Sequence, residues 1–217
     1  ATMLSYIFTD ARLTQSTLDR LLREQVALSF NRITVDGDTS TNDCCLLSAT
    51  GCSAAPVEAE SGQCHAVFEE ALADIFRELA VELIKDAEGA TKFVTVAVTG
   101  GRDSGECLQV GYAVAESPLV KTALFASDPN WGRILAAIGR AGLDSFDINA
   151  VEVWLGNTRI VENGCRDAHY TEEAGQAEMD RNEITISISL ARGDFSEKIF
   201  TADLSYDYVR INADYRS

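Results

Sequence analysis

Short apolar runs with a two-residue period predict β-strands along much of the chain. The first run, residues 3–9, is apolar at Leu4, Tyr6 and Phe8 and also at Met3 and Ile7. Because both faces are largely apolar, we expect a strand that is buried on both sides. The other strands are expected at residues 33–36, 44–49, 93–98, 122–126, 151–155, 158–161, 184–190 and 198–204.

Apolar residues spaced three and four positions apart predict α-helices between these strands. The longest, residues 64–87, carries a stripe that includes Phe68, Leu72 and Phe76, and Gly89 follows at a typical C-terminal capping position. The other helices are expected at residues 16–30 with Ser16 as N-terminal cap, 104–115, 134–140, and 171–179 with Thr171 as cap.

Turn residues complete the predicted organisation. Gly156 and Asn157 separate two strands and predict a hairpin, whereas residues 192–194 form a turn between the last two strands. Residues 51–63 are small and polar, which predicts a loop or lid. We expect a mixed α/β chain in which residues 1–217 form a single unit, with a soft boundary between lobes near residues 142–149.

Composition narrows the classes of partner. Hydrophobic residues make up 46% of the 217 residues and charged residues 24%, which is typical of a globular protein. The formal net charge of −16 disfavours nucleic acid or an anionic membrane as a partner, because both require a basic surface. It is compatible with a cationic substrate.

Six cysteines are present, but none are spaced as Cys-x-x-Cys, and there are only two histidines. A zinc site is therefore not expected, and the cysteine pattern favours free thiols in a reducing cytoplasm. No run approaches 18 uninterrupted apolar residues, so no membrane span is predicted.

The sequence lacks several common catalytic motifs. It has no Gly-x-Ser-x-Gly, no glycine-rich phosphate loop and no histidine pair at ligand spacing. We expect His65 and His169 to be solvated. Thr2 lies one position from the first residue, where a hydroxyl nucleophile could use a free α-amine as its base.

Five separate segments are distinctive in combination and in this order. They are Ala1-Thr2-Met3-Leu4, the hydroxyl- and carboxylate-rich loop 34–43, the helix end 86–92, the turn 128–133 and the tail 204–217. Together they resemble the ornithine acetyltransferase (ArgJ) family of arginine biosynthesis, and the resemblance covers essentially the whole chain as the β chain of that family.

This resemblance implies a precursor that cleaves itself between Ala1 and Thr2. Thr2 would then be the nucleophile that carries acetyl from N-acetylornithine to glutamate, and it would also contact substrate. The family's substrate-binding residues fall on Glu88, Asn212 and Ser217. Glu88 is expected to hold the ornithine ammonium, while Asn212 and Ser217 contact the α-carboxylate end.

The same resemblance implies a layered α/β fold of the DmpA/ArgJ type that is completed by a separate α chain. That chain would supply the oxyanion hole, and the assembly would be an α2β2 heterotetramer in the cytoplasm. No cofactor or metal is implied, although acetyl-CoA is a possible co-substrate.

Two alternatives remain open on the sequence. The first is an aminopeptidase or amidase of the same fold that passes the acyl group to water, although the related aminopeptidases use serine as nucleophile. The second is a non-enzymatic binding subunit in which Ala1 remains attached and leaves Thr2 inert.

Overall fold

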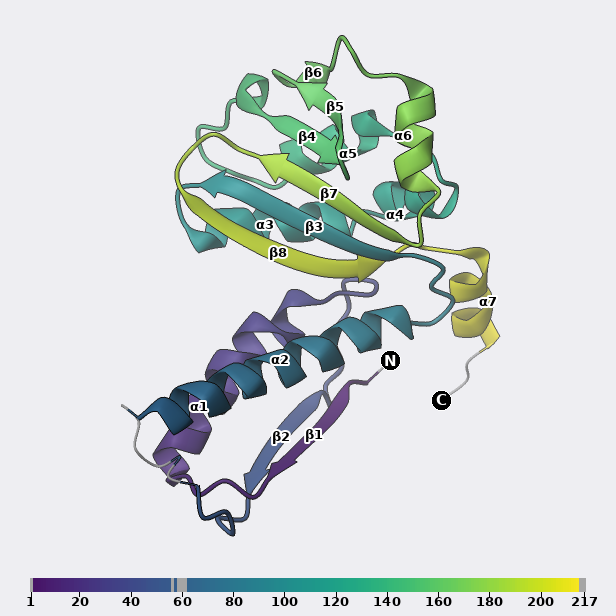
Figure 1. The fold of residues 1–217 in the computed structure, drawn as a ribbon. Helices are drawn as coiled ribbons and strands as arrows, with labels where there is room; N and C mark the ends of the chain where they lie inside the picture. The colour runs from purple at the N-terminus through teal and green to yellow at the C-terminus, as the bar shows by residue number, and fades with distance from the viewer. Residues whose placement is uncertain (1, 56, 58–61, 215–217) are drawn as a thin grey trace. The chain divides into compact units, whose positions relative to one another are not determined.

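Two separate units make up the chain in the computed structural model, which describes residues 2–55, 57 and 62–214 (Figure 1). The first unit comprises Ala1–Ile33 and Asp38–Glu82, and the second comprises Thr34–Gly37 and Leu83–Ser217. Residues 142–149, where the sequence suggested a soft boundary, lie inside the second unit. The division instead follows two distinct hydrophobic cores.

The first unit packs helices against a two-stranded parallel sheet. Strand β1 (Leu4–Thr9) pairs with β2 (Cys44–Ala49), so that Leu4 lies opposite Cys44. The sheet is accompanied by α1 (Gln15–Leu28), η1 (Phe30–Arg32) and α2 (Gln63–Lys85). The buried core consists of Ile7, Leu21, Phe30, Leu47, Leu72, Phe76 and Ala80.

Only one face of β1 is buried, which corrects the expectation of burial on both sides. Ser5 and Ile7 are buried, whereas Leu4 and Tyr6 are each 55% exposed and Phe8 is 74% exposed. The described residues of this unit supply one core, and it lies on the Ile7 side of the strand. The strand therefore presents a row of large apolar side chains on its other face.

The second unit is built on a six-stranded sheet with the order β6-β5-β4-β7-β3-β8 (Figure 1). Strand β3 runs parallel to β7 and antiparallel to β8, and it lies between them. The turn at residues 192–194 therefore joins strands that are not neighbours. The strands are β3 (Phe93–Gly101), β4 (Glu152–Leu155), β5 (Thr158–Glu162), β6 (Cys165–Arg166), β7 (Glu183–Ser189) and β8 (Phe195–Ala202).

Helices complete the second unit, and their ends follow local capping rules. Asp103 accepts a hydrogen bond from the Glu106 backbone, and Thr171 accepts one from the Ala174 backbone, as predicted for Thr171. The predicted hairpin of β4 and β5 is also confirmed. The helices are α3 (Ser104–Ala115), α4 (Pro118–Phe125), α5 (Trp131–Gly139), η2 (Ile148–Ala150), α6 (Glu172–Met179) and α7 (Tyr206–Asp214).

Three local predictions are wrong. The strand expected at residues 122–126 is instead the end of helix α4 and its C-cap, Ala126, because Pro118 starts a helix whose buried residues include Val120 and Leu124 at helical spacing. Residues 33–36 form no strand, since only Ile33 makes an isolated bridge before a turn. Helix α1 is capped by Thr14, which accepts from the Thr17 backbone, rather than by Ser16.

Candidate functional site

Thr2 lies two positions before β1, and the loop that precedes β2 contacts it. Its Oγ1 is 2.7 Å from Ser40 Oγ, and either hydroxyl can be the donor. The neighbouring Met3 N–H donates to Asp43 Oδ1 at 2.8 Å, while Ser40 N–H donates to Asp43 Oδ2 at 3.2 Å. The Asp43 carboxylate thus joins both segments, and Ser40 Oγ contacts the exposed Thr2 hydroxyl.

Ala1 and Ser217 lie outside the described residues. The cleavage-site residue before Thr2 and the last hydroxyl of the chain therefore stay predictions.

The second unit brings Glu88 and Asn212 together. Glu88 is half-buried in the turn after α2, and Asn212 is exposed in α7. Asn212 Nδ2 donates to Glu88 Oε2 at 2.8 Å and to the Tyr208 carbonyl at 3.0 Å. Both hydrogen-bond partners of Nδ2 are acceptors, so they fix which end of the amide is the NH2 group.

This orientation determines what the pair can bind. Asn212 Oδ1 and Glu88 Oε1 make no hydrogen bond within the described residues. The pair therefore presents a carboxylate oxygen and an amide oxygen, which accept hydrogen bonds from a cation such as an ammonium group. The carboxylate end that the sequence suggested for Asn212 would need donors, and Nδ2 donates to Glu88 and Tyr208 in this structure. That contact stays a prediction.

A glycine allows α7 to approach the Glu88 turn. Gly89 has a φ of +69°, and a Cβ built on it would lie 2.5 Å from Tyr208 N. Ser205 Oγ donates to the Gly89 carbonyl at 2.6 Å and accepts from Tyr208 N–H at 3.3 Å. Any larger residue at position 89 would overlap the first turn of α7.

Asp203 fixes the other side of this turn. It is 5% exposed and accepts hydrogen bonds from Thr91 N–H at 2.8 Å, Thr91 Oγ1 at 2.6 Å and Lys92 N–H at 2.9 Å. The residues that follow Glu88 are thereby tied to the segment that leads into α7.

Lys121 is a buried charged residue that was not among the candidates predicted from the sequence. It is 2% exposed, and its Nζ donates to Thr201 Oγ1 at 2.8 Å and to the Ala202 carbonyl. Burial lowers the pKa of Lys121 to about 8, although the nearby charge of Asp203 opposes this shift. A lysine inside an otherwise apolar stretch is the available signal, and it directly precedes residues 122–126, for which the sequence predicts a strand.

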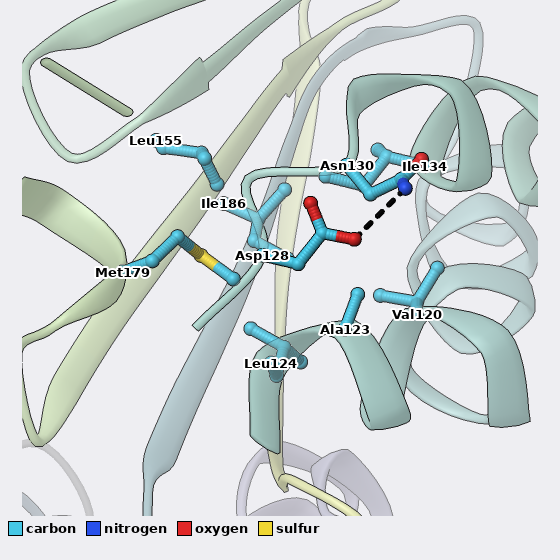
Figure 2. Close-up of a pocket in the computed structure, with 9 residues that line it drawn as sticks. All are labelled: Val120, Ala123, Leu124, Asp128, Asn130, Ile134, Leu155, Met179 and Ile186. Carbon is cyan, nitrogen blue, oxygen red and sulfur yellow. Dashed lines mark hydrogen bonds between the residues drawn. The ribbon is translucent and has the colours of Figure 1, made fainter. Parts of the chain in front are cut away.

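The turn at residues 128–133 closes a small apolar pocket in the second unit (Figure 2). Its polar lining consists of Asp128 and Asn130, which hydrogen-bond to each other at 3.0 Å. Asn130 Oδ1 also accepts from Arg133 N–H at 3.1 Å and so caps α5. Residues 128–133 thus line the pocket and cap α5, and they contain no predicted site residue. The remaining lining residues are Val120, Ala123, Leu124, Ile134, Leu155, Met179 and Ile186.

The two histidines differ in their exposure to solvent. His65 is 2% exposed, so its predicted solvation is wrong: Nδ1 lies 2.8 Å from the Val57 carbonyl and Nε2 lies 3.2 Å from Arg20. His169 is exposed, as predicted.

The described residues show neither a metal cluster nor a membrane-spanning helix. That part of the chain holds no group of three or more His, Cys, Asp or Glu side chains placed to bind a metal. It also holds no helix long and apolar enough to cross a membrane. All six cysteines are free thiols.

The chain is similar in sequence to known proteins over its whole length. The model of the ArgJ family matches residues 1–217. The arginine biosynthesis bifunctional protein ArgJ of Pseudomonas syringae pv. tomato is 57% identical over all of this chain, and that of Pseudomonas fluorescens is 55% identical. The chain spans about half of these relatives, 54% of the length of each.

A solved structure has the same fold. The crystal structure of the arginine biosynthesis bifunctional protein argJ from Bacillus halodurans matches 99% of this chain and 100% of its own chain. Its TM-score is 0.89 at 36% sequence identity. The layered ArgJ-like α/β fold expected from the sequence is therefore confirmed.

Proposed function

This chain belongs to the ArgJ family, and on that premise we propose that it is the β-chain half of an ornithine acetyltransferase. The enzyme transfers acetyl from N-acetylornithine to glutamate in arginine biosynthesis. The observation that carries this proposal is the 57% identity, over the full chain, to a relative named for arginine biosynthesis. That name favours acetyl transfer over the aminopeptidase or amidase alternative.

Thr2 is the proposed nucleophile. Cleavage between Ala1 and Thr2 frees the α-amine of Thr2, which accepts the hydroxyl proton as Oγ1 attacks the acetyl carbonyl. The bond from the carbonyl carbon to the ornithine nitrogen breaks, ornithine leaves with a proton on that nitrogen, and acetyl-Thr2 remains. The glutamate amine then attacks the ester, so that acetylglutamate forms and the hydroxyl is restored. The hydrogen bond between Thr2 and Ser40 supports this role, because it fixes the hydroxyl that must attack.

Glu88 and Asn212 are proposed to bind the side-chain ammonium of N-acetylornithine. Their available oxygens are both acceptors, which suits a cation. Ser217 is proposed to bind the α-carboxylate end. No metal or cofactor takes part. The relatives' names include the word bifunctional, and acetyl-CoA is the proposed second acetyl donor.

The other half of the protein is the proposed partner. The chain spans 54% of its relatives' length, which supports a longer precursor with an α portion. The exposed apolar row of Leu4, Tyr6 and Phe8 on β1, with Leu46 on β2, is a surface that this α chain would cover. The α chain would supply the oxyanion hole, and the cytoplasmic assembly would be α2β2.

Acetyl transfer in the full-length protein tests this function. We expect acetylglutamate to form in step with loss of acetylornithine, and Thr2→Ala to abolish both cleavage and transfer. Acetate release without acetylglutamate would favour the hydrolase. No turnover, with Ala1 retained on every chain, would favour a binding subunit.

A further inference from the structure

Helix α7 is held mainly by polar contacts. None of its residues is buried, and Tyr206 and Val209 are 83% and 60% exposed. Apolar packing therefore contributes little to its position. The place of Asn212 must depend on the hydrogen bonds that join this helix to the rest of the second unit.

Tyr208 makes one of these hydrogen bonds. Its hydroxyl donates to Asp36 Oδ2 at 2.8 Å, across 172 positions of sequence. Its carbonyl accepts from Asn212 Nδ2 at 3.0 Å. One residue thus contacts both the segment 34–37 and the amide that binds Glu88.

The acceptor Asp36 lies on a well-anchored segment. Thr34 N–H donates to the Phe200 carbonyl of β8 at 3.0 Å, and Gly37 N–H donates to Thr34 Oγ1 at 3.1 Å. The positive charge of the buried Lys121 also attracts the Asp36 carboxylate. The hydroxyl of Tyr208 therefore joins α7, through the segment 34–37, to the edge strand β8 of the six-stranded sheet.

We propose that Tyr208 is a positioning residue for substrate binding, which acts through Asn212. Its hydroxyl holds α7 against the segment 34–37, and its carbonyl fixes the Asn212 amide so that Oδ1 faces the ammonium beside Glu88. Tyr208 itself does not touch the substrate. This inference rests on the proposed function, because the ammonium is that of N-acetylornithine.

The test is Tyr208→Phe in the full-length protein, which removes only the hydroxyl. The matched control is Tyr206→Phe on the same helix, whose hydroxyl makes no hydrogen bond within the described residues and whose ring contact with Phe125 is kept. We expect Tyr208→Phe to raise KM for acetylornithine by about 2- to 10-fold, as the loss of one hydrogen bond implies. The value of kcat and acetylation of Thr2 at saturating substrate should stay unchanged, as should both parameters in the control.

A double-mutant cycle separates positioning from a general loss of stability. If Tyr208 acts through Asn212, Tyr208→Phe should have no further effect on KM in an Asn212→Ala background. An equal effect in both backgrounds, or a fall in kcat that follows a lower melting temperature, would overturn the inference.

The same measurements distinguish this inference from the proposed function. An unchanged KM in Tyr208→Phe, while Glu88→Gln and Asn212→Ala raise it, would overturn only the role of Tyr208. An unchanged KM in all three variants would overturn the substrate site and the inference together.

Discussion

Asn212 donates a hydrogen bond of 2.8 Å to Glu88, although the two residues lie 124 positions apart in the sequence. The contact joins the turn after α2 to the last described helix, and it leaves two acceptor oxygens available to a ligand. It is the observation that supports the proposal that this pair binds the ammonium of the substrate.

Replacing Glu88 should weaken substrate binding strongly. Glu88→Gln keeps the shape but removes the negative charge that pairs with the ammonium, a contact worth about 1.5–3 kcal/mol. We expect kcat/KM for acetylornithine to fall about 10- to 150-fold. Glu70→Gln, at an exposed position of α2, is the control and should behave as wild type. A specificity constant unchanged in Glu88→Gln would remove Glu88 from the site.

Gly89 is predicted to be essential to the approach of α7. Gly89→Ala would place a side chain at a φ of +69° and at 2.5 Å from Tyr208 N. Strain and overlap together should cost about 3 kcal/mol or more of unfolding free energy.

Gly51→Ala provides the control for Gly89→Ala. Gly51 has a similar φ of +72°, but no atom lies within 4 Å of its built Cβ. Gly51→Ala should therefore lower the unfolding free energy through backbone strain alone, by about 1–2 kcal/mol. Urea unfolding of both variants measures the difference, and equal losses would show that the contact with α7 is unimportant.

The half-buried ion pair of Glu106 with Arg192 should make the unfolding free energy sensitive to acid. Hydrogen bonds from Arg192 at 2.9 and 3.1 Å, and one from the Arg102 backbone at 3.0 Å, lower the pKa of Glu106 to about 2. The folded state thus binds fewer protons than the unfolded state between about pH 2 and 4.5. The unfolding free energy contributed by Glu106 is present above this window and is lost as the pH falls through it.

The unfolding free energy, measured from pH 6 down to pH 2.5, tests this link between stability and protonation of Glu106. Glu106→Gln should be less stable than wild type at pH 6, and the difference should narrow as the pH falls. Glu173→Gln, exposed in the first turn of α6, should retain the wild-type slope. A gap between Glu106→Gln and wild type that stays constant with pH would contradict the linkage.

Much of the fold could be predicted from local sequence patterns. Periodicity identified β1, β2 and α3, and the Gly156-Asn157 turn identified the hairpin of β4 and β5. These features depend on neighbouring residues, so a single sequence contains their signal. The residue types in separated segments also identified Thr2, Glu88 and Asn212 as candidates, but only through resemblance to a family.

Other features depend on contacts between distant residues. Local patterns do not indicate that β3 lies between β7 and β8, because strand order is set by long-range packing. The burial of Lys121 requires acceptors from β8, 80 positions away. The alternation of residues along β1 also does not reveal that Leu4 and Phe8 are exposed. An apolar face indicates that a partner could cover it, but not whether this chain supplies that partner.

If Thr2 carries the acetyl group, an acid-quench experiment will trap it as an ester on that residue. The mature full-length protein is incubated with N-acetylornithine in the absence of glutamate, quenched in acid and mapped by mass spectrometry. We expect one added acetyl group on the peptide that begins at Thr2, and we expect it to be absent when glutamate is supplied before the quench. An unmodified peptide, with turnover that follows a sequential rather than a ping-pong mechanism, would contradict it.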